Sequence, residues 1–305
     1  MTEPQESPRQ PPLFRQSLAK VLLQECPALV KKQLDNAREK TTAAMTGGGL
    51  LDALVMGHHH KYEVVQAFYK SGPRKGEPCI DWQGAEARKE KERIQATGKL
   101  PVLQNELDEL DEAAAAIKRR LGELYEQEAE GHGYKVMFQP QMRWTSALGV
   151  ACRGEPDIVI RVSHPAVTRL ATVDIKHSAA LAREKLHRQV FAMGWDIQGA
   201  AYREAVVAEE LRLSEGSGKP VQHVAHYLLL TNSMEEGLPP CCVPLSTTYL
   251  AVGLRRWEKA QRVWQSCLDT GNWTGYSESP IEPSHFVVRT ELEAFDEDSF
   301  EGEEP

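Results

Sequence analysis

The sequence lacks any long uninterrupted hydrophobic run. No apolar stretch reaches the roughly 18 residues that a membrane-crossing helix needs. The first residues, Met1-Thr2-Glu3-Pro4, also lack the pattern of a secretory signal peptide. We therefore expect a cytoplasmic protein with no membrane partner.

Cysteine is sparse and scattered. The 305 residues contain six cysteines and no Cys-X-X-Cys pair. A chain of this length can bury a sizeable core without disulfides, and an iron–sulfur cluster needs four suitably spaced cysteines. We expect neither a disulfide framework nor an iron–sulfur cluster.

A surplus of positive charge is lacking as well, since the formal net charge is −8. Eight acidic residues and no basic ones lie between Glu291 and Pro305, so the rest of the chain is neutral overall. Nucleic-acid binding by the body of the protein is therefore not excluded. An acidic tail of this kind is typically disordered. It either keeps the protein soluble, competes with DNA for a basic groove, or binds a partner.

Three regions follow from composition and pattern. Residues 1–40 predict a flexible lead-in and a helix over about 17–40, residues 41–285 a single α/β domain, and residues 286–305 the acidic tail. Within the domain, helical patterns at 85–96 and 104–127 are joined at Gly98-Lys99-Leu100-Pro101. They predict a helical hairpin, inserted at about 84–129.

An apolar stripe marks the second helix of this insertion. It consists of Leu103, Leu107, Leu110, Ala114, Ile117, Leu121 and Leu124. Steps of alternately four and three residues are typical of a helix that buries one face. The face packs either against the protein's own domain or against a second subunit in a coiled coil.

Two short β-branched runs with acidic ends are the most informative part of the chain. Residues 158–162 and 170–173 flank His164-Pro165 and predict a β-hairpin. Asp157 opens its first strand and Asp174 closes its second, so the antiparallel pairing brings both carboxylates to one edge of the sheet. Lys176 follows two residues later and points to the same face as Asp174.

This arrangement suits metal-dependent cleavage of a phosphodiester. Magnesium prefers oxygen ligands, and one or two carboxylates are enough to hold it against a phosphate. A lysine beside it can orient the attacking water and stabilise negative charge. The alternative is two solvated acidic turns with a lysine nearby.

The remaining patterns complete a mixed α/β core. Strands are predicted over 134–144, 150–161, 170–176 and 221–230, with helical regions over 179–213 and 248–268. An apolar helix, Leu50–Met56, carries Asp52 in its middle. Burying an unpaired carboxylate costs several kcal/mol, so Asp52 faces either solvent or a positive group such as a metal ion.

In this order, the motifs resemble the PD-(D/E)XK nuclease superfamily, and within it the RecE-like (exonuclease VIII type) prophage exodeoxyribonucleases. The resemblance runs from about Thr41 to Tyr276. It rests on the Asp52 helix and on the segments Gly149–Asp157, Asp174-Ile175-Lys176, Gly194–Tyr202 and Gly271–Tyr276.

The resemblance implies a restriction-endonuclease-like fold, in which helices flank a mixed central sheet. It also implies a Mg²⁺-dependent enzyme, with Mn²⁺ able to substitute, that resects one strand from the ends of double-stranded DNA for phage-type recombination in a bacterial host cell. Such enzymes often encircle DNA as homo-oligomers, and a single-strand annealing protein is a possible partner.

The resemblance also implies roles for particular residues. Asp52, Asp157, Asp174 and the Ile175 carbonyl would hold the metal, and Lys176 would position or activate the water. Gln198 and Tyr202, four apart on one helix face, would lie beside the active centre and contact DNA or the water. Basic residues on the helix after the motif either contact phosphates or form a solvated face: Arg183, Lys185 and Arg188.

Two positions depart from the family pattern. Asp52 stands where relatives usually have a histidine, and Gln139 where they usually have a glutamate. Glu155, two residues before Asp157, is expected on the same strand face and could supply the missing negative charge. Gln139 motivates one alternative, a nuclease-fold DNA-binding protein with impaired catalysis. Two others stay open: an endonuclease with the same chemistry, and an interaction protein built on the 103–124 helix and the tail, in which the motif is accidental.

Overall fold

A computed structural model describes residues 12–35, 43–177, 182–214, 218–231 and 239–276. The start of the predicted lead-in, the end of the predicted 17–40 helix and the acidic tail lie outside the described residues. In the part of the chain that is described, no helix is long and apolar enough to cross a membrane.

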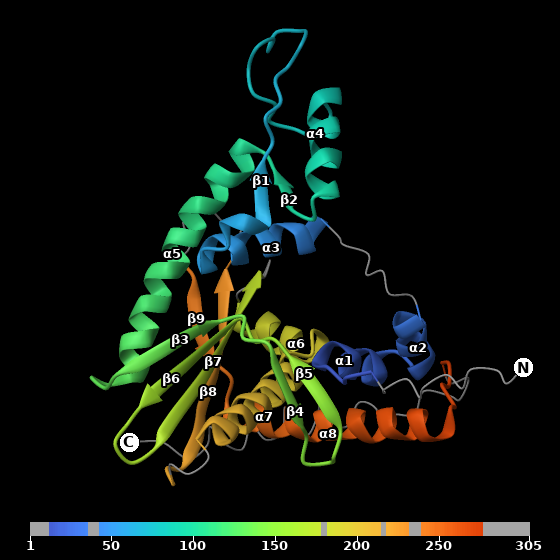
Figure 1. Ribbon diagram of the computed structural model, residues 1–305, viewed down its shortest axis with the longest axis vertical. Helices are drawn as coiled ribbons and strands as arrows, with labels where there is room; N and C mark the ends of the chain where they lie inside the picture. The colour runs from blue at the N-terminus through green and yellow to red at the C-terminus, as the bar shows by residue number, and fades with distance from the viewer. Residues whose placement is uncertain (1–11, 36–42, 178–181, 215–217, 232–238, 277–305) are drawn as a thin grey trace, which may run out of the picture.

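A five-stranded mixed sheet forms the centre of the molecule, in the order β3-β6-β7-β8-β9 (Figure 1). Only β7 and β8 pair in parallel; the other neighbours are antiparallel. The strands are β3 (Tyr134–Phe138), β6 (Ile158–Ser163), β7 (Thr168–His177), β8 (Val221–Thr231) and β9 (Cys241–Pro244). The predicted α/β class with a mixed, helix-flanked sheet is confirmed.

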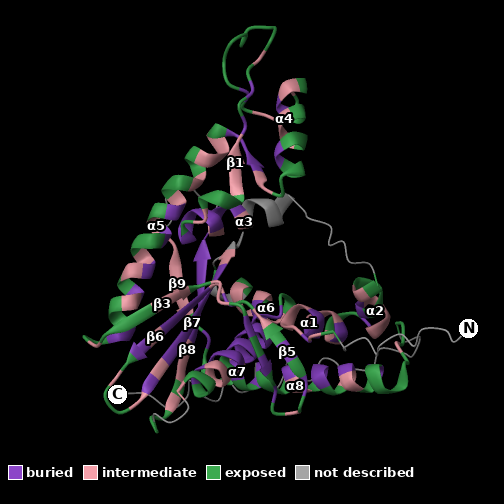
Figure 2. Ribbon diagram, in the orientation of Figure 1, coloured by how far each residue is buried: buried purple, intermediate pink, exposed green. Residues whose placement is uncertain are grey.

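Helices cover both faces of this sheet, which explains why its middle strands read as almost continuous apolar runs. On one face, α3 (Ala43–Met56) and α5 (Gln104–Ala129) pack on Ile158, Ile160 and Val173. On the other, α7 (Trp195–Leu213) and α8 (Thr247–Thr270) share a core with Val159 and Leu170. Figure 2 shows that the middle of the sheet is buried between these helices. A further helix, α6 (Arg183–Ala192), comes directly before α7 in the chain.

The strands predicted over 134–144 and 150–161 are each divided in two. Pro140 and Pro156 interrupt them, because proline has no N–H group for a sheet ladder. The outer parts, β4 (Met142–Thr145) and β5 (Ala151–Gly154), form a separate antiparallel pair that packs on α7. The hairpin of β6 and β7 has the predicted antiparallel pairing.

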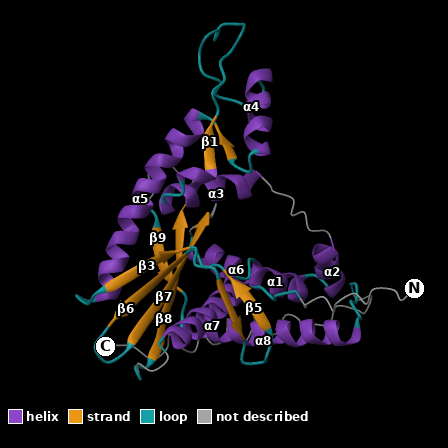
Figure 3. Cartoon of the chain, in the orientation of Figure 1, coloured by secondary structure: helices purple, strands orange, loops and turns teal. Residues whose placement is uncertain are grey.

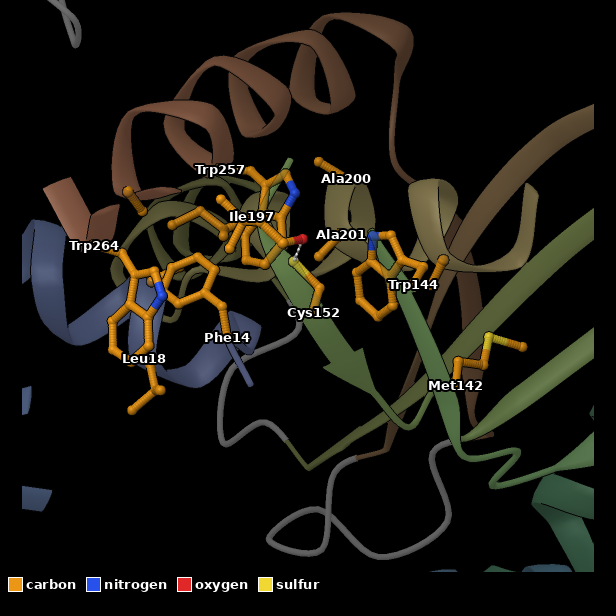
Figure 4. Packing of buried hydrophobic residues seen from close by; sticks show 14 of the residues in the cluster. Phe14, Leu18, Met142, Trp144, Cys152, Ile197, Ala200, Ala201, Trp257 and Trp264 are labelled. Atoms are coloured by element: carbon orange, nitrogen blue, oxygen red, sulfur yellow. Dashed lines mark hydrogen bonds between the residues drawn. The ribbon is translucent and has the colours of Figure 1, made fainter. Parts of the chain in front are cut away.

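The N-terminal segment belongs to the core. The helix predicted over 17–40 is instead two helices, α1 (Gln16–Gln24) and α2 (Pro27–Asp35), and proline begins the second. Phe14 is fully buried, with ring centroids 4.9 Å from Trp257 and 5.1 Å from Trp264 (Figure 4). Its N–H donates to the Ala151 carbonyl at 2.9 Å, which ties α1 to β5.

The inserted region is not a simple helical hairpin. The residues between its two helices form β2 (Leu100–Val102), which pairs in parallel with β1 (Tyr62–Val64), just after the short 3₁₀ helix His59–Lys61. The first helix, α4 (Ala85–Ala96), packs on β2 and projects beyond the main body (Figure 3). The apolar stripe of α5 faces the protein's own core, where Ile117, Leu121 and Leu124 are buried.

Candidate functional site

The two carboxylates predicted from the sequence meet at one edge of the sheet. Ile158 on β6 pairs with Val173 on β7, so the register places Asp157 opposite Asp174. Asp174 is 1% exposed and Asp157 is half-buried. Asp157 Oδ2 accepts a hydrogen bond of 2.8 Å from the Ile175 N–H, which fixes its carboxylate against the end of β7.

Gln198 and Lys176 hold the second carboxylate. Gln198 Nε2 donates to Asp174 Oδ1 at 2.9 Å, and the Lys176 ammonium forms an ion pair with Asp174 Oδ2. Gln198 comes from α7, whereas Lys176 and Asp174 lie two residues apart on β7. Sheet and helix together therefore orient both oxygens of this carboxylate.

Burial and mutual repulsion disturb the protonation of these groups. Burial, and then the charges of Asp174 and Asp52, raise the pKa of Asp157 well above its usual range. Burial and Asp174 likewise raise the pKa of Asp52 to about 6, against the opposing charges of Lys176 and Lys61. These carboxyl groups lie close together and largely out of contact with water. A bound cation would therefore stabilise their charged forms.

Lys176 has the opposite electrostatic environment. Burial alone would lower its pKa, but the carboxylates of Asp174 and Asp157 outweigh this effect and raise the pKa above its usual value. The side chain is 20% exposed. The two carboxylates therefore favour the charged ammonium form of Lys176.

The donors present fit magnesium. Asp157 and Asp174 supply hard oxygens, their carboxyl groups interact directly, and magnesium commonly uses only one or two protein carboxylates. Asp52 is near enough to interact electrostatically with Asp174. Among the described residues, however, no three His, Cys, Asp or Glu side chains converge as a ready set of ligands. Asp157 and Asp174 would therefore be the main protein ligands, with Asp52 and the Ile175 carbonyl as candidates for further contacts.

Tyr202 supports the site from within the protein. Its side chain is 4% exposed, and its hydroxyl donates to the Glu155 carbonyl at 3.0 Å. The same oxygen accepts a hydrogen bond of 3.2 Å from Gln198 Nε2. Tyr202 and Gln198 share one helix face, as predicted, but Tyr202 is placed to position Gln198.

Gln139 stands beside Asp157, where the family pattern has a glutamate. It follows β3 in a left-handed conformation with φ of +44°, and its N–H donates to the Asp157 carbonyl at 2.8 Å. Its side-chain oxygen accepts a hydrogen bond of 2.6 Å from Lys61 Nζ. Glu155 is exposed in the turn between β5 and β6, and not on the strand face with Asp157 as predicted, because Pro156 ends the strand.

Two basic residues near the site were missed in the sequence. Lys61 influences the pKa of Asp52, and Lys20 on α1 is close enough to Lys176 that both burial and the Lys176 charge lower its pKa. Neither lysine belongs to a sequence motif. They lie near the site only because α1 and the 3₁₀ helix pack beside it. Of the predicted phosphate contacts, Lys185 and Arg188 are exposed on α6; the side chain of Arg183 lies outside the description.

The fold has a counterpart among solved structures. It is similar to a protein from Eubacterium rectale called a "putative exonuclease", with a TM-score of 0.52 and 15% sequence identity over 90% of this chain and 92% of that chain. At this identity the likeness shows a shared fold. A second structure, SSO0001, covers 72% of this chain and 86% of its own at 14% identity, but its TM-score of 0.26 is too low to support an argument.

No protein-family model matches this sequence, and no curated protein is significantly similar to it. The chain is therefore placed by its fold, a mixed α/β sheet flanked by helices and shared with the Eubacterium rectale protein.

Proposed function

We propose that the protein is a Mg²⁺-dependent deoxyribonuclease that hydrolyses phosphodiester bonds at the Asp157–Asp174 edge of the sheet. The observation that carries this proposal is the pair of facing carboxylates beside Lys176, with Gln198 bonded to Asp174. Magnesium, or manganese in its place, would neutralise charge on the phosphate and make water a better nucleophile.

The protein's own residues bind and orient the reacting groups. Asp157 and Asp174 would hold the cation, with Asp52 and the Ile175 carbonyl as further contacts. Gln198 fixes the Asp174 carboxylate, and Tyr202 fixes Gln198. The Lys176 ammonium, paired with Asp174, orients water by donating hydrogen bonds and stabilises the developing negative charge.

The finer proposal is an exonuclease that resects one strand from the ends of double-stranded DNA during phage-type recombination in the bacterial cytoplasm. Two observations support it: the resemblance of the motifs to RecE-like enzymes, and the fold shared with a protein called a "putative exonuclease". A homo-oligomer that surrounds the DNA, and cooperation with a single-strand annealing protein, belong to the same proposal.

A pair of substrates tests the reaction and its dependence on ends. The full chain is incubated with linear duplex DNA and with covalently closed circular DNA, in Mg²⁺ and in a chelator. We expect the linear DNA alone to be degraded, and only in Mg²⁺. Cleavage of the circle would indicate an endonuclease with the same chemistry.

One observation favours a second candidate, a DNA-binding protein with impaired catalysis. Gln139 offers a neutral oxygen beside Asp157 where the family pattern has a charged one, and Lys61 already occupies that oxygen. Binding of linear DNA without hydrolysis in Mg²⁺ or Mn²⁺ would establish this candidate and overturn the enzyme.

A further inference from the structure

A polar cavity of about 650 Å³ lies next to the carboxylates. Its wall combines the start of α1, the β4–β5 pair and the side of α7. Tyr202 and Glu155 belong to this wall, and Tyr202 shares Gln198 with Asp174. The side chains of Tyr202 and Gln198 therefore connect the wall of the cavity to Asp174.

Arginine dominates the lining of this cavity. Four arginines contribute to it, against two carboxylates, Glu155 and Glu209. Glu209 is already engaged, since its oxygens accept hydrogen bonds of 2.8 and 2.9 Å from Arg212. The other arginines are Arg15, Arg143 and Arg153. The cavity therefore carries a surplus of positive charge in a protein whose net charge is −8.

Two of these arginines face each other directly. Arg143 on β4 pairs with Arg153 on β5, and both side chains are exposed on the same face. The neighbouring pair, Trp144 and Cys152, points into the core (Figure 4). Like charges directly opposite in an antiparallel pair destabilise it. An anion between the two guanidinium groups would remove that repulsion.

We propose that this arginine cavity binds the phosphodiester backbone of a single DNA strand that continues from the reaction centre. The inference rests on the proposed function, because it concerns the same DNA substrate, in the part of the strand next to the bond that is cleaved. Guanidinium groups bind phosphate oxygens with two parallel hydrogen bonds, because their planar fork of N–H donors matches the geometry of a phosphate. The positive end of the α1 dipole at Gln16 and Ser17 adds to the attraction.

The size of the cavity favours a single strand over a duplex. A volume of about 650 Å³ is within the range of small-ligand pockets, which is enough for one or two nucleotides. Arg153, Gly154 and Glu155 line the cavity, and Asp157 follows two residues after Glu155 in the chain. A strand seated there would thus place an adjoining phosphate near the carboxylates.

Binding of a fluorescent single-stranded oligonucleotide, measured by anisotropy in a chelator, tests the proposal without hydrolysis. The variant is Arg143→Gln with Arg153→Gln, and the control is Arg262→Gln, an exposed arginine on α8 whose side chain pairs with Glu258. We expect the double variant to bind at least about tenfold more weakly. The slope of log K against log salt should decrease by about 1.4, at about 0.7 for each lost phosphate contact. The control should retain both values.

Thermal unfolding provides a second readout, because relief of the repulsion should stabilise the free protein. The double variant is expected to melt about 1–3 °C higher than the wild type at low salt, while binding more weakly. A purely structural role for the arginines would instead lower the melting temperature. Binding within twofold of the wild type, with an unchanged salt slope, would overturn the proposal.

The failures of the two proposals can be told apart. If the protein hydrolyses DNA in Mg²⁺ but the double variant binds the oligonucleotide as tightly as the wild type, the cavity assignment is overturned and the proposed nuclease activity stands. Binding that depends on both arginines would support the cavity even if no hydrolysis occurred. A terminal phosphate that strengthens wild-type binding more than about tenfold, and not that of the double variant, would overturn the backbone assignment in favour of an end-binding pocket.

Discussion

The N–H of Gln139 donates a hydrogen bond of 2.8 Å to the carbonyl of Asp157, so a residue with a neutral amide side chain lies beside a residue of the proposed metal site. Gln139, Asp157 and Asp174 occupy neighbouring positions across β3, β6 and β7. The third strand thus offers a place for one more charged ligand, which this chain does not fill.

Gln139→Glu should therefore strengthen metal binding. An added carboxylate increases the negative charge available to the cation, and ligand charge sets affinity at oxygen sites. We expect the Mg²⁺ concentration for half-maximal hydrolysis to fall by about tenfold, and a titration of initial rates measures it. Gln95→Glu, an exposed position on α4, is the control and should leave that concentration unchanged. An unchanged midpoint for Gln139→Glu would contradict the placement of the metal.

Gln198 should act by positioning Asp174. Gln198→Ala removes the hydrogen bond to Asp174 Oδ1, and loss of a group that orients a metal ligand typically costs about 10–100-fold in metal affinity or activity. We expect a higher Mg²⁺ midpoint in the same titration. Tyr202→Phe, which keeps the ring but removes the hydroxyl, should shift the midpoint in the same direction by less. Equal activity of Gln198→Ala and wild type at limiting Mg²⁺ would contradict this role.

Lys176 should contribute charge to the reaction. Lys176→Ala is expected to lower the rate of hydrolysis by about 10²–10³-fold at saturating Mg²⁺, the usual cost of removing one electrostatic stabiliser. The folded state should persist, as circular dichroism would verify. Lys118→Ala, an exposed position on α5, should keep full activity. A Lys176→Ala variant with a near-normal rate would show that another group supplies the charge.

Helix packing depends on Gly253. A Cβ atom at this position would lie 2.0 Å from the Asp196 carbonyl oxygen, which belongs to the facing helix α7. Since main chain cannot move aside, Gly253→Ala should destabilise the protein by about 3 kcal/mol or more, measured by denaturant unfolding. Gly122 on α5 has open space around it, and Gly122→Ala should stabilise by about 0.5–1 kcal/mol.

Stability should decrease in mild acid because of buried histidine. His226 is fully buried, and burial lowers its pKa from 6.5 to about 4. Above pH 6.5 the histidine is neutral in both states. Between pH 6.5 and 4 only the unfolded chain takes up this proton, so His226 alone lowers the free energy of unfolding by on the order of 3 kcal/mol, while the raised pKa of Asp52 acts in the opposite direction. The difference between wild type and His226→Gln in unfolding free energy across this range measures the contribution of His226. His226→Gln should reduce the loss of stability, whereas exposed His60→Gln should not.

The sequence was sufficient for the parts of the fold and site that depend on local pattern. The β6–β7 pairing followed from two β-branched runs, and this pairing alone brought Asp157 and Asp174 together. The one-face arrangement of Gln198 and Tyr202 followed from helical spacing. Both are short-range relationships, which residue spacing determines directly.

Features that depend on long-range packing could not be predicted. Phe14 packs against Trp257 and Trp264 of α8, which are far away in the sequence. This packing positions α1, so that Lys20 lies near Lys176. The arginine cavity joins residues from α1, β4, β5 and α7, none of which forms a motif. Pro140 and Pro156 were visible in the sequence, and their effect on the predicted strands could have been recognised.

Hydrolysis of end-labelled linear duplex DNA in Mg²⁺, with wild type and Asp174→Asn measured side by side, tests the central claim most directly. The substitution keeps the shape of the side chain and removes its charge. The account predicts steady release of nucleotides by the wild type, and release slower by at least about 10³-fold by a folded variant. A wild type that is inactive in every divalent metal, or an Asp174→Asn variant that is equally active, would contradict it.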